Sequence, residues 1–324
     1  MKRILIIQTA FIGDVILATP LISNLKAEFK DAKIDFLVKK GNESLLENHP
    51  DVNNVLVFDK KDKLKSLRSL ISSIRKEKYD LLVNLHRFAS SGIISWLSGA
   101  KIKYGFKKNP FSFSYTKAFE HEIGNGEHEV DRNLKLISDI TKNSIRKPQL
   151  FPSESDFSFV TKWQEKAYYC LAPASVWFTK QAPQEVWVQL IQKLSISNAD
   201  IYLIGGPIDN DLCTEILQKS NCQNAFNLAG KLSFMQSAAL MKNAQRNYVN
   251  DSGPLHFASA MNAPVSAFFC STSPTFGFGP LSDDSEIIEV QNLDCKPCGL
   301  HGHSTCPKGN FRCGNELDLK FIKH

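Results

Sequence analysis

Residues 3–14, RILIIQTAFIGD, decide the fold class of this chain. Six residues rich in Ile and Leu are typical of a buried strand, and the helical pattern VILATPLISNLKAEF follows a short loop. Further strands are expected at KIDFLVKK, NNVLVFD and YDLLVNLH, with the amphipathic segment KLKSLRSLISSIRKEK between the last two. Alternating strands and helices of this size predict a parallel, doubly wound sheet.

A second series of strands and helices begins with AYYCLAPAS at 167–175 and runs to PVSAFFC at 264–270. The turn-rich stretch KPQLFPSESD, 147–156, separates it from the first series. We therefore predict an α/β protein with two Rossmann-like domains, 1–155 and 156–324, the second ending in a Cys-rich segment at about 295–313. The cleft between such domains is the expected ligand site.

The composition points to a folded, cytoplasmic protein with one basic half. Hydrophobic residues make up 43% of the chain and charged residues 22%, which is close to the globular average. The first apolar run ends at Gln8, too early for a signal peptide, and no stretch approaches the length of a membrane span. Residues 1–150 hold 26 Lys and Arg against 17 Asp and Glu, and the remainder 13 against 16. The first half therefore suits an anionic partner.

Asp14 ends the loop between the first strand and the first helix. This loop has one glycine, Gly13, where a dinucleotide-binding turn needs G-x-G-x-x-G, which argues against a nicotinamide or flavin enzyme. An Asp in a first helical turn is ordinarily a cap for backbone N–H groups. At the carboxyl end of a strand it can instead be a general base for an acceptor hydroxyl. Both interpretations stay open for this loop.

Two loops of the second series suit a phosphate-bearing ligand. Lys180 follows the small residues of APAS at 172–175, where backbone N–H groups can approach phosphate. Asp251 and Ser252 precede the helix GPLHFASAMN, whose N-terminus suits a diphosphate. A solvated lysine, and an N-cap beside a packed histidine, are the alternative explanations. The hydroxyl-rich loop 271–273 returns to the same edge and favours a site there.

Several segments resemble, in order, the landmarks of glycosyltransferase family 9, the heptosyltransferase family of lipopolysaccharide core assembly. They are FIGDVILATPLISNLK, SVWFTKQAP, LIGGPIDND, NLAGKLS and NDSGPLHFASAMNAPVSAFFCSTSP. The resemblance implies a GT-B fold, with two Rossmann-like domains facing across a cleft. It also implies sugar transfer with inversion and without a catalytic metal or other cofactor.

The resemblance also implies roles for individual residues. Asp14 matches the base that deprotonates the acceptor, and Leu232 matches an apolar contact with adenine. The other expected donor contacts are Thr179, Lys180, Asp251, Ser252, Gly253, Leu255 and His256. On the acceptor side we expect Thr9, Gly13, Arg87 and Arg132. Arg87 lies in Asn84-Leu85-His86-Arg87, which departs from the Asp-x-Gln-Gly that many members have.

The function that follows is transfer of heptose from ADP-heptose to a lipopolysaccharide-core or other lipid-linked acceptor. An anionic, lipid-linked acceptor would bring the protein into peripheral contact with the cytosolic face of the inner membrane. The alternative is a non-catalytic protein of the same fold that binds a nucleotide-sugar or a lipid-linked sugar.

Four cysteines near the end of the chain form a separate feature. Cys295, Cys298, Cys306 and Cys313 are separated by two, seven and six residues. Four cysteines can close a tetrahedral structural zinc site, and reduced or paired cysteines are the alternative. Together with the basic half, the cluster raises the hypothesis of a zinc-dependent nucleic-acid-binding protein. The spacing matches no zinc finger, so no nucleic-acid partner is expected.

Overall fold

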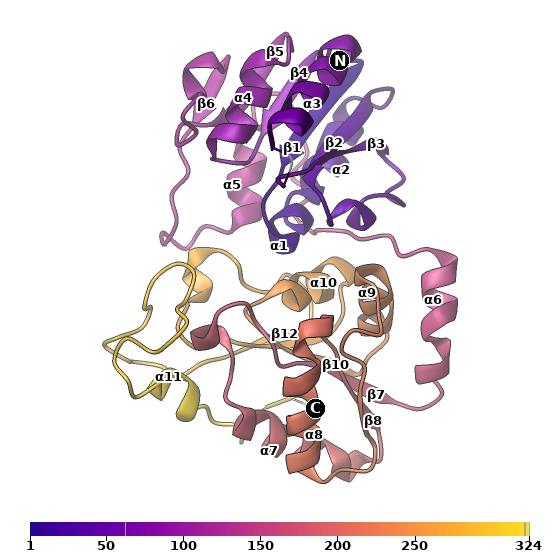
Figure 1. Cartoon of the computed structure of the whole chain (residues 1–324), viewed down its shortest axis with the longest axis vertical. Helices are drawn as coiled ribbons and strands as arrows, with labels where there is room; N and C mark the ends of the chain where they lie inside the picture. The colour runs from indigo at the N-terminus through magenta and orange to yellow at the C-terminus, as the bar shows by residue number, and fades with distance from the viewer. Residues whose placement is uncertain (62, 321, 324) are drawn as a thin grey trace. The chain divides into compact units, whose positions relative to one another are not determined.

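The computed structural model describes residues 1–61, 63–320 and 322–323. The chain divides into two compact units, Met1–Phe151 and Pro152–His324, which Figure 1 shows coloured along the chain. The division falls a few residues before the predicted boundary at 155. The reason is that helix α6 (Glu154–Val160) packs against α9 (Phe234–Lys242) of the second unit.

The first unit is built on a six-stranded parallel sheet in the order β3-β2-β1-β4-β5-β6. Its strands are β1 (Arg3–Gln8), β2 (Lys33–Lys39), β3 (Val52–Phe58), β4 (Leu81–Asn84), β5 (Ile102–Phe106) and β6 (Lys117–Phe119). This order reverses between β1 and β4. The loops that leave the carboxyl ends of these two strands therefore diverge and leave room for a ligand.

The first unit has five helices among its described residues; the third is the amphipathic segment named from the sequence, and the helix expected near the start differs in the structure. They are α1 (Ile12–Ile16), α2 (Thr19–Glu28), α3 (Lys63–Glu77), α4 (Ala89–Leu97) and α5 (Glu129–Lys135), with short 3₁₀ turns η1 (Glu43–Leu45) and η2 (Ser112–Ser114). The pattern from residue 15 to 29 predicts one helix, but the structure has two. Pro20 lies in the first turn of α2, where its missing N–H is not needed, and so a new helix begins there.

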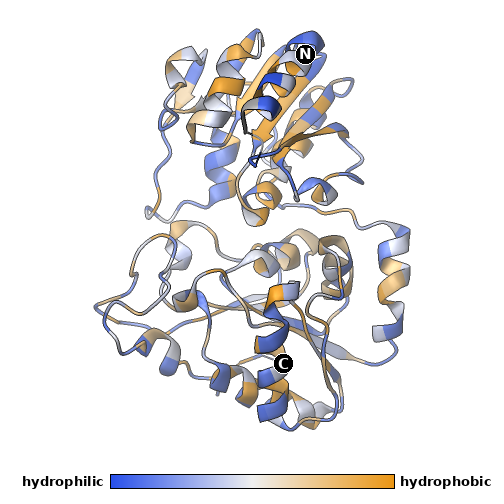
Figure 2. Ribbon diagram, viewed as in Figure 1, coloured by the Kyte–Doolittle hydropathy of each residue, from blue (hydrophilic) through white to orange (hydrophobic). Residues whose placement is uncertain are grey.

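The core of the first unit is the apolar strand that opens the chain. Ile4, Leu5, Ile6 and Ile7 of β1 are completely buried, because the sheet is covered on both faces. Figure 2 shows the central strands as the most hydrophobic part of this unit. Full burial of each such side chain contributes about 1.5–3 kcal/mol to stability, so β1 fixes the position of the loop that follows it.

The second unit repeats this topology with the order β12-β11-β10-β7-β8-β9, again with all neighbours parallel. Its strands are β7 (Tyr168–Ala172), β8 (Asp200–Leu203), β9 (Ala225–Asn227), β10 (Arg246–Asn250), β11 (Val265–Phe268) and β12 (Ser285–Ile288). The order reverses between β7 and β10. The prediction of two Rossmann-like doubly wound units is confirmed.

The second unit contains helices α6 to α11. Beyond α6 and α9 these are α7 (Gln184–Leu194), α8 (Asn210–Ser220), α10 (Gly253–Met261) and α11 (Arg312–Asn315). Short 3₁₀ turns are η3 (Thr161–Trp163), η4 (Phe178–Lys180), η5 (Ser195–Ser197), η6 (Pro207–Asp209) and η7 (Pro274–Phe276). Trp187 of α7 anchors the core, with its ring 5.0 Å from that of Phe268 in β11. Among the described residues, no helix has the length and apolar character needed to cross a membrane.

Candidate functional site

Several of the predicted site residues follow the strands between which the order of each sheet reverses. In the first unit, Thr9 follows β1 and Arg87 follows β4. In the second unit, Lys180 follows β7 and Asp251 follows β10. Ligands of doubly wound sheets bind at these reversal points, so each unit carries the polar residues where its topology makes space for a ligand.

Asp14 lies in the first turn of α1, partly buried. Its carboxylate accepts a hydrogen bond of 3.1 Å from the N–H of Phe11, so it caps the helix as the ordinary explanation requires. Its pKa is nevertheless raised from 3.8 to about 6, chiefly because burial removes water from the carboxylate and also because of the negative charge of Glu129. The Phe11 N–H and the charge of Arg87 act in the opposite direction. A carboxylate with this pKa can accept a proton near neutral pH.

The loop before Asp14 is held by three side chains from neighbouring elements. The Thr9 hydroxyl lies 3.0 Å from Nδ1 of His86, and Lys60 donates to the Thr9 carbonyl at 2.8 Å. Asn42 donates to the carbonyl of Ala10 at 3.2 Å. Burial, aided by Lys60 and Arg87, lowers the pKa of His86 to about 4, so this imidazole is neutral at pH 7. The loop is therefore fixed without any ligand.

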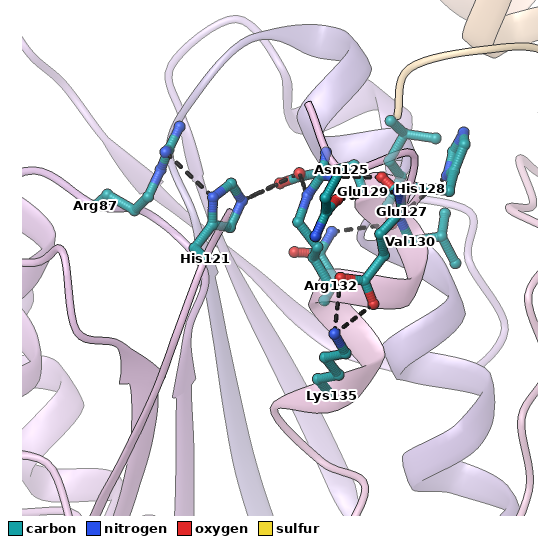
Figure 3. Close-up of polar contacts among 11 residues, drawn as sticks. Arg87, His121, Asn125, Glu127, His128, Glu129, Val130, Arg132 and Lys135 are labelled. Atoms are coloured by element: carbon teal, nitrogen blue, oxygen red, sulfur yellow. Dashed lines mark hydrogen bonds and ion pairs between the residues drawn. The ribbon is translucent and has the colours of Figure 1, made fainter. Parts of the chain in front are cut away.

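A chain of polar contacts connects Arg87 to α5, as Figure 3 shows. The guanidinium of Arg87 lies 3.3 Å from Nδ1 of His121, and Nε2 of His121 lies 3.1 Å from the Glu129 carboxylate. Glu129 also accepts a 2.7 Å hydrogen bond from Arg132. Burial alone would raise the pKa of Glu129, but its hydrogen bond with His121 and its attraction to His121 and Arg132 lower it. Glu129 is thus a buried anion whose charge acts on Asp14.

Arg132, predicted on the acceptor side, is buried in the structure. Its side chain is only 1% exposed, because it is the ion-pair partner of the buried Glu129. An unpaired carboxylate there would be costly to bury, so Arg132 supports Glu129, and its place on the acceptor side stays a prediction. Sequence reasoning missed Glu129 and His121. The one available signal was an acidic residue in the first turn of a helix, next to the apolar Val130.

Arg87→Gln is expected to move the acid limb of kcat/KM to higher pH. Asp14 must be deprotonated to act as a base, so activity should rise with pH through about 6, and removing the Arg87 charge removes an influence that lowers the pKa of Asp14. Measured pH profiles of both proteins check this shift. Lys30→Gln, at an exposed position, should leave the limb in place. A limb that moves to lower pH in Arg87→Gln would contradict the assignment.

In the second unit, Lys180 and Asp251 form a short ion pair. The Lys180 ammonium lies 2.7 Å from the Asp251 carboxylate, with the two side chains 16% and 8% exposed. Asp251 also accepts a 2.7 Å hydrogen bond from the hydroxyl of Thr272. Two predicted donor residues are therefore brought together from loops after β7 and β10, with a third residue from the loop after β11. The ion pair with Asp251 holds the ammonium group of Lys180 in one position, although the lysine side chain is long and flexible.

Thr179 is buried within a network of backbone and hydroxyl contacts. Its hydroxyl lies 2.9 Å from that of Ser271 and accepts the His303 N–H at 2.8 Å. Its backbone N–H and C=O bond the His303 carbonyl and the Ser271 N–H. Gly302 has a φ of +75°, and a Cβ there would lie 2.9 Å from Cγ of Lys180. The Cys-rich segment therefore packs directly on the Lys180 loop, a contact that sequence reasoning missed.

The loop from Asp251 leads into α10. Ser252 is its N-cap residue, and a Cβ built on Gly253 would meet no described atom within 4 Å. The N-terminus of a nine-residue helix is thus open to a ligand there. Leu255 and His256 are buried on the inner side of the helix. Leu232 is partly buried in the turn before α9.

The four C-terminal cysteines are present as free thiols. In the part of the chain that the structure describes, no three His, Cys, Asp or Glu side chains are arranged to hold a metal ion. The N–H of Cys298 donates to the carbonyl of Ser271, and the carbonyl of Cys298 lies 2.8 Å from Nε2 of His303. The structural metal site stays a prediction.

Comparisons with known proteins show the family and the fold of this chain. The model of the family "Glycosyltransferase family 9 (heptosyltransferase)" matches residues 67–308. The chain is 29% identical to lipopolysaccharide heptosyltransferase 3 of Escherichia coli over 285 residues, 82% of this chain and 83% of that protein.

Two solved structures have the same fold. The Escherichia coli ADP-heptose lps heptosyltransferase II matches with a TM-score of 0.78 and 23% identity, covering 92% of this chain and 96% of that chain. The Escherichia coli heptosyltransferase WaaC with ADP matches with a TM-score of 0.73 and 20% identity, covering 88% and 92%. The predicted GT-B fold class is confirmed. The family match spans most of the chain, and the chain therefore belongs to glycosyltransferase family 9, the heptosyltransferase family.

Proposed function

We propose that this glycosyltransferase moves heptose from ADP-heptose to a lipopolysaccharide-core or similar lipid-linked acceptor, with inversion at the anomeric carbon. The observation that carries the proposal is that each sheet has a polar site where its strand order reverses. The site of the first unit holds Asp14, a carboxylate able to accept a proton, and the site of the second unit holds Lys180, which suits phosphate. The names of the relatives support the sugar and the nucleotide, since they include ADP-heptose, ADP and lipopolysaccharide.

Asp14 acts as the general base in this proposal. An acceptor hydroxyl attacks the anomeric carbon, the new C–O bond forms as the bond to the diphosphate breaks, and the hydroxyl proton passes to the Asp14 carboxylate. The raised pKa of about 6 favours that transfer, because a carboxylate with the ordinary pKa is a weaker base. Thr9 and Gly13 shape the rigid loop, and Arg87 adds a positive charge for an anionic acceptor.

Lys180 and the N-terminus of α10 stabilise the departing diphosphate. The leaving group gains negative charge as the sugar departs, and a fixed ammonium group and helix N–H groups lower the energy of that charge. Asp251 keeps Lys180 in place before the donor binds, and Thr179, Ser252, Gly253 and His256 complete the donor side. Leu232 packs on the nucleotide base, and Leu255 supports the loop from inside. No metal ion has a part in the proposed chemistry.

The four cysteines are proposed as a structural metal site, with zinc as the ion. Cys295, Cys298, Cys306 and Cys313 would supply the four thiolates that tetrahedral zinc takes once the ion draws them together, and the segment that holds them packs on Thr179 and Lys180. Metal analysis of the purified chain tests this proposal. One zinc per chain supports it, and a metal-free, fully active protein contradicts it.

A thermal-shift screen with ADP-, GDP-, UDP- and TDP-linked sugars tests the donor. A ligand stabilises only the state that it binds, so a saturating donor at 100 times its Kd should add about 2.7 kcal/mol to the free energy of unfolding. We expect this effect with ADP-heptose alone. Equal stabilisation by UDP- or GDP-sugars would contradict the proposed donor. Binding without turnover on any lipid-linked acceptor would favour the non-catalytic alternative.

A further inference from the structure

Three aromatic rings form a cluster at the surface of the first unit. Trp96, near the end of α4, stacks on Phe111 at 5.8 Å and meets Phe113 edge-on at 6.1 Å, and the last two rings are 5.9 Å apart. Trp96 is 46% exposed and Phe113 is 72% exposed. Side chains of this size are normally buried, and an exposed group of them marks an interaction surface.

The cluster is held firmly by the segment that carries it. A Cβ on Gly92 would lie 2.2 Å from Oδ1 of Asn109 and 2.9 Å from Cβ of Phe111, so residues 109–111 pack directly on α4. The buried Asn109 donates to the carbonyl of His86 at 2.9 Å and accepts the N–H of Phe111 at 2.9 Å. The rings are thus presented by a fixed loop, which lowers the entropy lost when a partner binds them.

The stretch of sequence that carries this cluster is rich in positive charge. Residues 60–118 contain 14 Lys and Arg and 3 Asp and Glu, a net charge of +11 where the whole chain has +6. Nζ of Lys103 lies 3.4 Å from the carbonyl of Trp96, and Lys108 is exposed. The basic helix α3 packs beside α4, as Figure 1 shows, with Arg75 reaching Gly99 at the end of α4. Lys103 beside Trp96 and Lys108 in the loop before Phe111 thus accompany the aromatic rings.

We propose that Trp96, Phe111 and Phe113, with Lys103 and Lys108, bind the surface of an anionic lipid bilayer. Aromatic rings favour the boundary between headgroups and acyl chains, and lysines are attracted by anionic headgroups. The surface deepens the proposed function, since a lipid-linked acceptor is presented at a membrane. It lies outside the residues proposed for catalysis and donor binding.

Sedimentation of the full chain with vesicles tests the surface. Binding should be strong with vesicles that contain phosphatidylglycerol and at least tenfold weaker with pure phosphatidylcholine. The double variant Trp96→Ala/Phe113→Ser should bind the anionic vesicles at least tenfold more weakly than wild type. Lys103→Gln/Lys108→Gln should lose about fivefold for each lysine. Neither ADP-heptose nor an acceptor is present, so this result is independent of the proposed reaction.

Matched variants in the second unit serve as controls. Phe226 is 43% exposed and Lys231 is also exposed, so Phe226→Ser/Lys231→Gln makes a similar change to surface chemistry away from the cluster. This variant should bind vesicles as wild type does. Equal loss in the control, equal binding to neutral vesicles, or unchanged binding by both cluster variants would overturn the proposal. So would a dimer in solution that the Trp96→Ala/Phe113→Ser variant dissociates, since a second copy would then cover the rings.

Discussion

Asp14→Asn is expected to lower the rate of sugar transfer by about 10²–10⁴-fold, the usual contribution of a general base. The amide keeps the size of the side chain and can still accept the hydrogen bond from Phe11, but it cannot take a proton from the acceptor hydroxyl. Initial rates of ADP release with ADP-heptose and a lipopolysaccharide-core acceptor measure the effect. The affinity for the donor, measured by calorimetry, should stay within about twofold.

The stability of the same variant separates a chemical effect from a loss of fold. The pKa of Asp14 in the folded protein, about 6, lies above its ordinary value of 3.8, so ionising this carboxyl destabilises the fold. The penalty is fully present above pH 6 and disappears as the pH falls below 4. Asp14→Asn should therefore raise the free energy of unfolding by about 1–3 kcal/mol at pH 8 and leave it unchanged at pH 3.5. A variant that is less stable than wild type at pH 8 would contradict this account of the site.

Lys180→Met is expected to lower kcat by about 10²–10³-fold and to weaken donor binding as well. Methionine keeps much of the apolar stem but removes the ammonium group that meets the diphosphate. Because Asp251 then loses its partner, the free energy of unfolding should also fall, and stability must be measured beside the rates. Donor titrations and single-turnover rates give the two effects separately.

Asp251→Asn provides a second variant at this pair. It leaves the ammonium of Lys180 in place and keeps an acceptor for the Thr272 hydroxyl, so the loss in kcat should be smaller than in Lys180→Met. Lys193 bonds carbonyls near the C-terminus, and Lys193→Met should change neither kcat nor donor binding. If Lys180→Met transferred sugar as fast as wild type, Lys180 would have no part in stabilising the leaving group.

The main elements of both sheets could be predicted because their strands are long and apolar. Five of the six residues of β1 and all five of β7 form buried runs that no helix pattern matches. The segments of β5, β6 and β12 gave no such signal. IKYGF is interrupted by a glycine, KAF has three residues, and SEII is half polar. These strands lie toward the sides of the two sheets.

The site could be predicted where its residues follow strands, and not where it depends on packing. Asp251 directly follows β10, and Asp14 and Lys180 lie in the segments that follow β1 and β7, all strands that the sequence pattern shows. The contact of His121 with Glu129 and the burial of Arg132 depend on how α5 packs, and a charged residue in a sequence is ordinarily expected to be exposed. The segment around Gly302 is more than a hundred residues from Thr179, so no local pattern could place them together.

Product analysis tests the central claim most directly. The full chain is incubated with ADP-heptose and a set of lipopolysaccharide cores truncated at successive sugars, and mass spectrometry follows the acceptors. The account predicts that one core gains the mass of a single heptose, with one ADP released for each product formed. The contrary result is that ADP-heptose binds but no core raises the release of ADP above the level measured without acceptor. The chain would then be a binding protein with the fold of a transferase.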